Sequence, residues 1–259
     1  GGRKANLSLE DQVLTVLMYY RLYITQVLLG YLVGLDDSNV SRLIAKLRPI
    51  LLTVLPTPAR ERSLFGQECS SEKRTNSLSD LLAKHPELKE VLLDATEQEV
   101  YKPQDPQQRK RNYSGKKKCH SLKTQVTATP SGLVLHLTYA LPGKVHDLTV
   151  LRGTGLLQQL PPNLRIRVDK GYDGIQASFP NHSFQQPHKA RRNKPLDLIQ
   201  KFANHTYNSL RIPIEHCLAH LQRFRLLATI FRGNHNPSSA DFCLIAGLHN
   251  FRKRDTLAW

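Results

Sequence analysis

The sequence predicts an α/β fold, a mixed β-sheet flanked by helices, preceded by a small all-helical domain. Over residues 7 to 52, apolar side chains recur at helical spacing, whereas from residue 88 short apolar runs alternate with helical segments. A stretch rich in Pro, Ser and charged residues separates these parts. The predicted divisions are a helical domain over 1–55, a linker with a short helix over 56–87, and an α/β domain over 88–259.

The composition is that of a basic globular protein. Of 259 residues, 40% are hydrophobic and 22% charged, which is ordinary for a folded domain. Lys and Arg total 37 against 21 Asp and Glu, a formal net charge of +16. Such an excess attracts polyanions, above all nucleic acid, although general basicity without a partner is the alternative. No apolar run reaches the roughly 18 residues of a membrane span, so no membrane partner is expected.

The cysteines carry no metal-binding or disulfide pattern. Cys69, Cys119, Cys217 and Cys243 lie far apart and form no CxxC pair. This spacing argues against a zinc site and against a disulfide framework. A reducing, cytoplasmic setting is therefore expected.

The N-terminal helices favour a helix-turn-helix. One helix covers Leu9 to Tyr20, a second covers Thr25 to Val33, and a third runs from Asp37 or Ser38 to about Leu47, before Pro49. Short helices joined by a Gly-containing turn make this motif, although three short helices also occur in other small domains. On the groove-entering helix, the predicted DNA contacts are Asn39, Ser41, Arg42 and Lys46.

The elements expected in the α/β domain follow from periodicity and turn residues. A short apolar strand ends on Asp94, a hairpin follows, and a later strand ends on Asp169. The remaining expected elements are a helix over 78–85, a basic loop over 102–123, hairpin strands over 122–129 and 133–140, and helices over 147–160, 196–208, about 211–231 and 239–251.

Three acids are candidates for a metal site. Asp94 and Asp169 each follow apolar strand residues, and Glu215 falls in the predicted first turns of a helix that starts near Pro213. Parallel neighbouring strands would bring two of the acids together, and a crossing helix would supply the third. Converging carboxylates bind hard cations such as Mg²⁺, whereas the alternative is that each acid is a solvated surface group.

Basic side chains around these acids are candidates for phosphate contacts. Tyr113, among them, could stack on a base, and Lys170 beside Asp169 could neutralise a phosphate. His146 and Asp147 suit a helix N-terminal cap and a catalytic role equally. The residues expected to line a DNA path, if they are not simply a solvated loop, are Arg109, Lys110, Arg111, Lys116, Lys117, Lys118 and Lys123.

Five segments occur together and in order: Leu93–Glu97, Tyr113–Lys118, Val145–Leu148, Val168–Tyr172 and Arg211–His216. With them the chain resembles the DDE transposases of the bacterial insertion-sequence type, the IS-five-like group related to eukaryotic Harbinger elements. The resemblance covers nearly the whole chain. It implies an RNase-H-like catalytic domain behind a helix-turn-helix, with Asp94, Asp169 and Glu215 as the metal-binding catalytic triad.

The same resemblance extends to a four-residue signature on the Glu215 helix. Tyr207, Arg211 and Glu215 look like the first three members of the family's Tyr-Arg-Glu-Lys signature, whose basic and aromatic members are expected at the DNA. The fourth position departs from the pattern, because Gln222 stands where the family usually has Lys, with Arg223 beside it. Gln222 could still reach DNA, but without a charge.

The function that the resemblance implies is DNA transposition. The protein would bind double-stranded DNA at terminal inverted repeats, cut phosphodiester bonds with two Mg²⁺ ions, for which Mn²⁺ is expected to substitute, and join the 3′ ends to target DNA. A homodimer or larger assembly would hold both ends, at the nucleoid of a bacterium or in a eukaryotic nucleus. The alternatives are a domesticated, non-catalytic DNA-binding protein and a metal-dependent nuclease without strand transfer.

Overall fold

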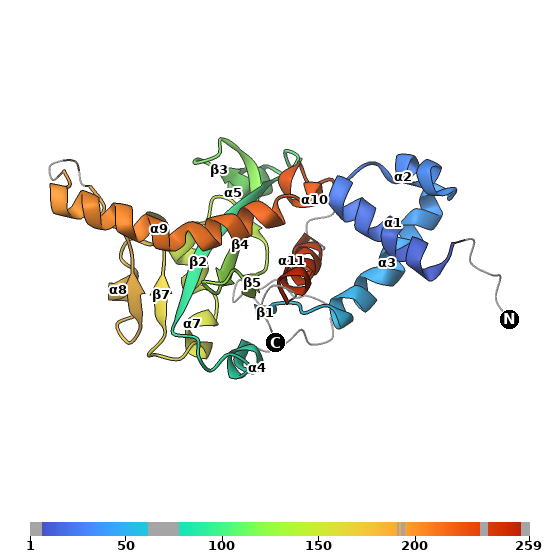
Figure 1. The fold of residues 1–259 in the computed structure, drawn as a ribbon. Helices are drawn as coiled ribbons and strands as arrows, with labels where there is room; N and C mark the ends of the chain where they lie inside the picture. The colour runs from blue at the N-terminus through green and yellow to red at the C-terminus, as the bar shows by residue number, and fades with distance from the viewer. Residues whose placement is uncertain (1–6, 62–77, 191, 193–194, 234–237, 255–259) are drawn as a thin grey trace.

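The computed structural model describes residues 7–61, 78–190, 192, 195–233 and 238–254. Cys69 and half of the predicted linker, residues 62–77, lie outside these ranges. Three N-terminal helices lie at one end of the molecule, and a twisted sheet with helices on both faces forms the rest (Figure 1). The division at residues 55 and 88 stays a prediction. No helix among the described residues is both long and apolar enough to cross a bilayer.

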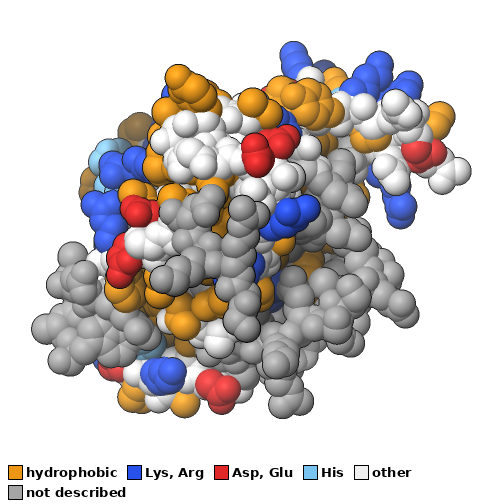
Figure 2. All heavy atoms as spheres, turned by 90° about the vertical axis from the view of Figure 1, so that its right-hand side faces the viewer, with side chains coloured by type: hydrophobic (Ala, Val, Ile, Leu, Met, Phe, Trp, Pro, Cys, Tyr) orange, Lys and Arg blue, Asp and Glu red, His pale blue; other side chains and the backbone are white. Residues whose placement is uncertain are grey.

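The helices α1 (Leu9–Leu22), α2 (Gln26–Val33) and α3 (Asp37–Val54) form the expected helix-turn-helix. The Thr25 hydroxyl caps α2 by accepting from the Leu28 amide. Gly30 is required where α2 meets the turn, because a Cβ there would overlap the Leu35 carbonyl oxygen. In Figure 2 this end of the molecule carries surface hydrophobic side chains with Lys and Arg between them.

The predicted end of the third helix at Leu47 is wrong, because α3 continues through Pro49 to Val54. A proline inside a helix removes one backbone donor and usually kinks or ends the helix. Here the buried face of α3 extends past Pro49, with Leu43 and Leu47 before it and Leu51 after it. Burial of that continuous face offsets the missing hydrogen bond.

The main sheet has the strand order β1-β5-β4-β2-β7-β8. The pairs β5–β4 and β4–β2 are antiparallel, whereas β2–β7 and β7–β8 are parallel. This mixed order around a long central strand is the RNase-H-like arrangement. The strands are β1 (Ala59–Glu61), β2 (Glu90–Glu99), β4 (Cys119–Ala128), β5 (Val134–Thr138), β7 (Arg165–Arg167) and β8 (Ser183–Gln185), with short β3 (Tyr113–Ser114) and β6 (Leu141–Pro142) beside β4.

The prediction that the first strand ends on Asp94 is wrong, since β2 runs on to Glu99. Antiparallel pairing with β4 continues to the end of β2, whereas parallel pairing with β7 stops at Leu92 opposite Arg167. Asp94 and Asp169 each lie two positions beyond that last pair. The two acids therefore follow adjacent strands in the same register, at the point where the parallel neighbour ends.

The helices of the α/β part also differ in their bounds from the prediction. A single helix, α9 (Leu198–Leu221), replaces the two predicted between 196 and 231, with Pro213 inside it. Its start has a capping box from Asp197 and Gln200. The remaining helices are α4 (Leu78–Ala83), α5 (Pro106–Asn112) within the predicted basic loop, α6 (Asp147–Arg152) and α7 (Leu156–Gln159) in place of one predicted helix, η1 (Lys170–Tyr172), α8 (Ile175–Ser178), α10 (Arg225–Ala228) and α11 (Ser238–Arg254).

The core has two parts, one on each face of the sheet. On β2, Leu92 belongs to one cluster while Val91 and Leu93 belong to the other, because successive strand side chains point to opposite faces. The Leu92 cluster includes α9, α11 and buried residues of α1 to α3. The N-terminal helices therefore share one hydrophobic core with the sheet.

Candidate active site

The structure brings the three predicted acids together around one side chain, Arg211. Its Nη2 lies 2.9 Å from Asp94 Oδ2, and its Nη1 lies 3.5 Å from Asp169 Oδ1 and 3.9 Å from Glu215 Oε1. Asp94 comes from the middle of β2, Asp169 follows β7, and Glu215 lies one helical turn after Arg211 on α9. Three segments that are remote in sequence thus meet at one cation.

The three carboxylates suit a hard divalent ion, although in this structure they surround the guanidinium of Arg211. Carboxylate oxygens are the ligands that Mg²⁺ takes from proteins. Among the described residues, no group of three His, Cys, Asp or Glu side chains is arranged as a ready metal site. The reason is visible in the contacts above, because the carboxylates surround Arg211 rather than a common point.

The electrostatics of the site differ from acid to acid. The Asp94 side chain is 21% exposed, whereas Asp169 is 39% and Glu215 57% exposed. Burial raises the pKa of Asp94, while Arg211 and the backbone amide of Ala95, at 2.8 Å, act in the opposite direction. Asp169 and Asp147 add to the rise. The site therefore favours any arrangement that adds positive charge beside Asp94.

Arg211 itself is buried, with only 6% of its side chain exposed. Its Nε has no hydrogen-bond partner among the described residues, although both terminal nitrogens face carboxylates. The sequence predicted a DNA contact for this residue. In this arrangement the guanidinium neutralises the acids instead, so a contact with DNA would require it to move.

Tyr207 is likewise occupied by the protein backbone. Its hydroxyl accepts from the Val168 amide at 3.0 Å and lies within donating distance of the Val168 and Gln185 carbonyl oxygens. These contacts tie α9 to the ends of β7 and β8, next to Asp169. The hydroxyl of Tyr207 therefore positions α9 in this structure, and its predicted contact with DNA stays a prediction.

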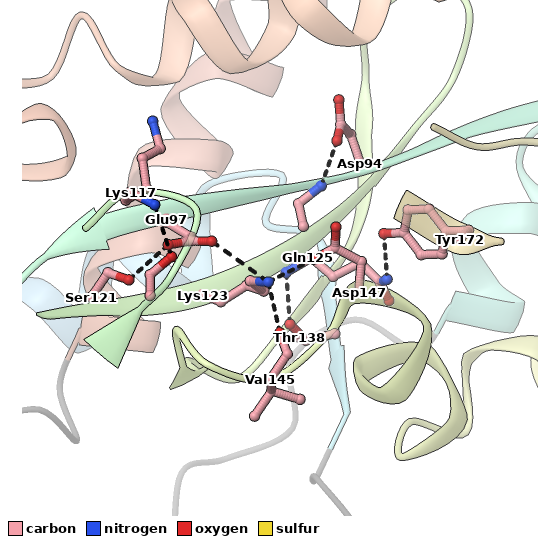
Figure 3. Close-up of polar contacts among 12 residues, drawn as sticks. Asp94, Glu97, Lys117, Ser121, Lys123, Gln125, Thr138, Val145, Asp147 and Tyr172 are labelled. Carbon is pink, nitrogen blue, oxygen red and sulfur yellow. Dashed lines mark hydrogen bonds and ion pairs between the residues drawn. The ribbon is translucent and has the colours of Figure 1, made fainter. Parts of the chain in front are cut away.

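A second group of charges lies on the opposite face of β2 (Figure 3). Lys123 Nζ donates to Asp147 Oδ1 and to the Val145 carbonyl oxygen, both at 2.7 Å, and lies 3.5 Å from Glu97 Oε1. Ser121 donates to the other oxygen of Glu97 at 2.7 Å. Lys123 is only 8% exposed and is paired with these acids, so a contact with DNA would require it to leave them, and that contact stays a prediction.

This second group supports the segment that follows Asp169. A Cβ on Gly171 would lie 2.8 Å from Asp147 Oδ2, so only glycine lets η1 pack this closely against α6. The buried Tyr172 hydroxyl accepts from Gln125 at 2.7 Å, and burial raises the pKa of Tyr172 well above its usual range. Neither His146 nor Asp147 makes a capping hydrogen bond to α6. Asp147 acts instead as the partner of Lys123.

A cleft of about 1200 Å³ opens beside Asp169, and its walls come from α5, the β3–β4 turn, the loop before α6, and η1. Of the predicted DNA contacts, Arg109, Lys110, Tyr113, Lys116, Lys123 and Lys170 line it. Arg111, Lys117 and Lys118 are exposed nearby but are not among the lining residues. Sequence reasoning missed two cations of the wall as DNA contacts: Lys102, which begins the predicted basic loop, and Lys144, which only the fold brings beside that loop.

The other predicted DNA contacts lie on exposed surfaces. Asn39, Ser41, Arg42 and Lys46 are all exposed on α3. Gln222, at the end of α9, is exposed and donates to Thr96 Oγ1 at 3.2 Å, and Thr96 shares the β2 face of Asp94. Arg223 is exposed beside it. These contacts with DNA stay predictions.

The fold and the convergent acids define an RNase-H-like protein with a carboxylate site. A family model described as "DDE superfamily endonuclease" matches residues 93–250, and one described as "Helix-turn-helix of DDE superfamily endonuclease" matches residues 5–57. The chain therefore belongs to the DDE superfamily endonucleases, as a DDE transposase with an N-terminal helix-turn-helix.

The chain is similar to a probable transposase for insertion sequence element IS702 from Microchaete diplosiphon. The two are 32% identical over 252 residues, which is 96% of this chain and 83% of that protein. Among solved structures, a Mos1 transposase paired-end complex with left transposon end aligns over 98% of this chain and 78% of that one, at 11% identity and a TM-score of 0.24. A mariner Mos1 paired-end complex with Mg covers 99% and 80%, at 12% identity and 0.22. TM-scores this low support no inference about this chain.

Proposed function

We propose that this DDE transposase binds the terminal inverted repeats of a mobile element, cuts phosphodiester bonds there and joins the freed 3′ ends to target DNA. The observation that carries the proposal is the convergence of Asp94, Asp169 and Glu215 on one cation, beside a basic cleft of about 1200 Å³. A carboxylate cluster next to a cation-lined cleft suits chemistry on a polyanion.

The residues proposed to hold the metal are the same three acids. Two bound Mg²⁺ ions, or Mn²⁺ in their place, would activate the attacking oxygen and stabilise the leaving oxygen. The chain itself fixes Asp94 and Asp169 in register on adjacent strands, and Tyr207 ties α9 to the strand end before Asp169. Arg211 occupies the space between the acids, so we propose that it turns away from them when metal and DNA bind.

The DNA is proposed to contact two surfaces. The exposed residues of α3 would read base edges of the repeat, and the cleft beside Asp169 would hold the backbone through Lys102, Lys110 and Lys170. An assembly of at least two copies would hold both ends of the element. We place this activity on chromosomal DNA, at the nucleoid of a bacterium.

The test is cleavage and joining of duplexes that carry the inverted repeats flanking the gene. The parent and an Asp94→Asn variant are incubated with Mg²⁺ and a target plasmid. Asp173→Asn is the matched control, because Asp173 is an exposed acid near the site that pairs with Lys189 instead of Arg211. We expect cut and joined products from the parent and the control, and neither product from Asp94→Asn.

Other outcomes would select the alternatives. Cut products without joined products would indicate a nuclease that lacks strand transfer. Binding of the repeats without cleavage, in Mg²⁺ and in Mn²⁺, would indicate a domesticated DNA-binding protein. Cleavage that persists in Asp94→Asn would contradict the assignment of the site.

A further inference from the structure

A second basic cleft, of about 490 Å³, lies between α1, the end of α9 and α11. It is separate from the cleft beside Asp169, and the two share no lining residue among those described. The described residues that line it include no Asp or Glu. Its cationic and titratable side chains are Arg21, His220, Arg223, His249, Arg252 and Lys253.

The charges in this second cleft crowd one another. Burial lowers the pKa of both His220 and His249, and the nearby Arg252 and Lys253 lower it further. The guanidinium of Arg21 lies 5.5 Å from the centre of the Phe224 ring, which lines the cleft. Positive charges gathered in one cleft attract a polyanion.

The walls of the cleft are held by buried contacts instead of by loops. On the α1–α11 side, the Tyr20 hydroxyl donates to Asp241 Oδ1 at 2.8 Å, and Arg48 of α3 lies 3.0 Å from the same oxygen. Arg232 lies over the Tyr23 ring, 4.1 Å from its centre, and donates to the Tyr23 carbonyl oxygen. The spacing between Arg21 on one wall and Arg252 on the other is therefore set by packing.

The cleft also lies between the two regions that would contact DNA. His216 and His220 are one turn apart on α9, and Arg223 follows the end of that helix, so this side of α9 leads from beside Glu215 to the cleft. The opposite wall is α1, which packs against α3, the helix whose exposed residues are predicted to contact DNA. A duplex that reaches from α3 to the acids would pass along this surface.

We propose that the second cleft binds the phosphodiester backbone of double-stranded DNA, in the segment between the bases contacted by α3 and the bond that is cut. This inference rests on the proposed function. Arg21, Arg223, Arg252 and Lys253 neutralise phosphates there without reading sequence. The cleft beside Asp169 then contacts a different stretch of the DNA, so the two clefts contribute separately to the affinity for DNA.

The test measures the salt dependence of DNA binding. The double variant Arg252→Gln/Lys253→Gln removes two charges from the cleft, and Lys84→Gln/Lys89→Gln removes two exposed charges far from it as a matched control. Binding of a labelled 30-base-pair duplex of arbitrary sequence is followed by fluorescence anisotropy over a range of salt. Each neutralised phosphate contributes about 0.9 to the steepness of log K against log salt, so we expect a decrease of about 2 in the cleft variant and none in the control.

A second variant distinguishes the loss of phosphate contacts from a folding defect. Arg21→Gln removes one charge from the opposite wall, on a different helix, and is expected to lower the steepness by about 1. Thermal melts of all variants identify any that unfold. Unchanged slopes in a folded Arg252→Gln/Lys253→Gln protein and in Arg21→Gln would overturn the inference, as would an equal decrease in the control.

The outcomes separate this inference from the proposed function. If the parent binds the duplex, cuts its own ends, and shows no dependence on the second cleft, only the inference fails. If the parent does not bind DNA at all, both fail. Asp94→Asn should keep the slope of the parent, because that residue contributes no positive charge.

Discussion

Two buried cations flank the central strand β2, and they differ in how fully the carboxylates enclose them. Lys123 lies between Glu97 and Asp147, which are 7% and 19% exposed, and also bonds a backbone carbonyl. Arg211, on the other face, contacts acids that are up to 57% exposed, at distances up to 3.9 Å, and its Nε is unpaired among the described residues. Lys123 is thus enclosed by its carboxylates, whereas Arg211 lies among more exposed acids, at the site proposed to hold metal.

The largest expected effect comes from removing the enclosed charge. Lys123→Met leaves Glu97 and Asp147 buried without a counterion, which we expect to destabilise the fold by about 3–5 kcal/mol. Urea unfolding measures the change. Lys117→Met, at an exposed position on the turn before β4, is the control and should stay within about 0.5 kcal/mol of the parent. A destabilisation below about 1 kcal/mol in Lys123→Met would mean that the two cations are equivalent after all.

A smaller effect is expected at the site proposed to hold metal. Arg211→Gln should destabilise the metal-free protein by about 1–2 kcal/mol, less than a closed pair, because solvent screens Asp169 and Glu215. Added Mg²⁺ or Mn²⁺ should then raise the melting temperature of the variant more than that of the parent, since no guanidinium competes for the carboxylates. Equal shifts in both proteins would show that Arg211 does not compete with metal.

A further substitution tests the connection between the charges around Lys123 and the acids around Arg211. Gly171→Ala places a methyl group 2.8 Å from Asp147 Oδ2 and should cost about 1–2 kcal/mol, because Asp147 or η1 must shift. The shift would also displace Asp169, two residues earlier, so cleavage should fall by more than stability alone explains. Gly174→Ala is unsuitable as a control, because its φ of 84° is itself unfavourable for alanine. Gly115→Ala, with no atom within 4 Å of the added methyl, serves instead.

The smallest effect is expected at the end of α9. Gln222→Lys restores the charge that related signatures carry, at an exposed side chain that now bonds Thr96. Stability should change by less than about 0.5 kcal/mol, while the salt slope of DNA binding should steepen by about 0.9 if the new charge meets a phosphate. An unchanged slope would place position 222 away from the DNA.

The sequence predicted the fold class and the meeting of three acids, and it erred where local rules compete with packing. Asp94 does not end its strand, because pairing with β4 outlasts pairing with β7. Pro213 does not begin a helix, because the buried face of α9 continues across it through Arg211, Ile214 and Cys217. Hydrophobic periodicity and proline position describe one segment at a time. The end of β2 and the course of α9 through Pro213, by contrast, depend on neighbouring segments.

The same limit applies to the partners of individual side chains, which the sequence did not predict. Lys123 stands in a run of basic residues and reads as solvent-exposed, yet its partner Glu97 is fixed only by strand register. Tyr207 and Arg211 carry the types expected at DNA, but their polar atoms contact Val168 and the acids. The residue types indicated which side chains matter, but the direction in which each side chain points could be known only from the fold.

The single core that joins the N-terminal helices to the sheet has a geometric consequence. Under the proposed function, α3 would read the repeat and the three acids would serve the bond that is cut. The contacts of Tyr20 and Arg48 with Asp241 fix α1 and α3 against α11, so α3 cannot drift relative to the sheet as a domain on a flexible linker would. The number of base pairs between the motif that α3 would read and the bond that would be cut is then fixed by the packing of the protein. Ends in which that interval is lengthened or shortened by even half a helical turn of DNA would present the wrong side of the duplex to the acids.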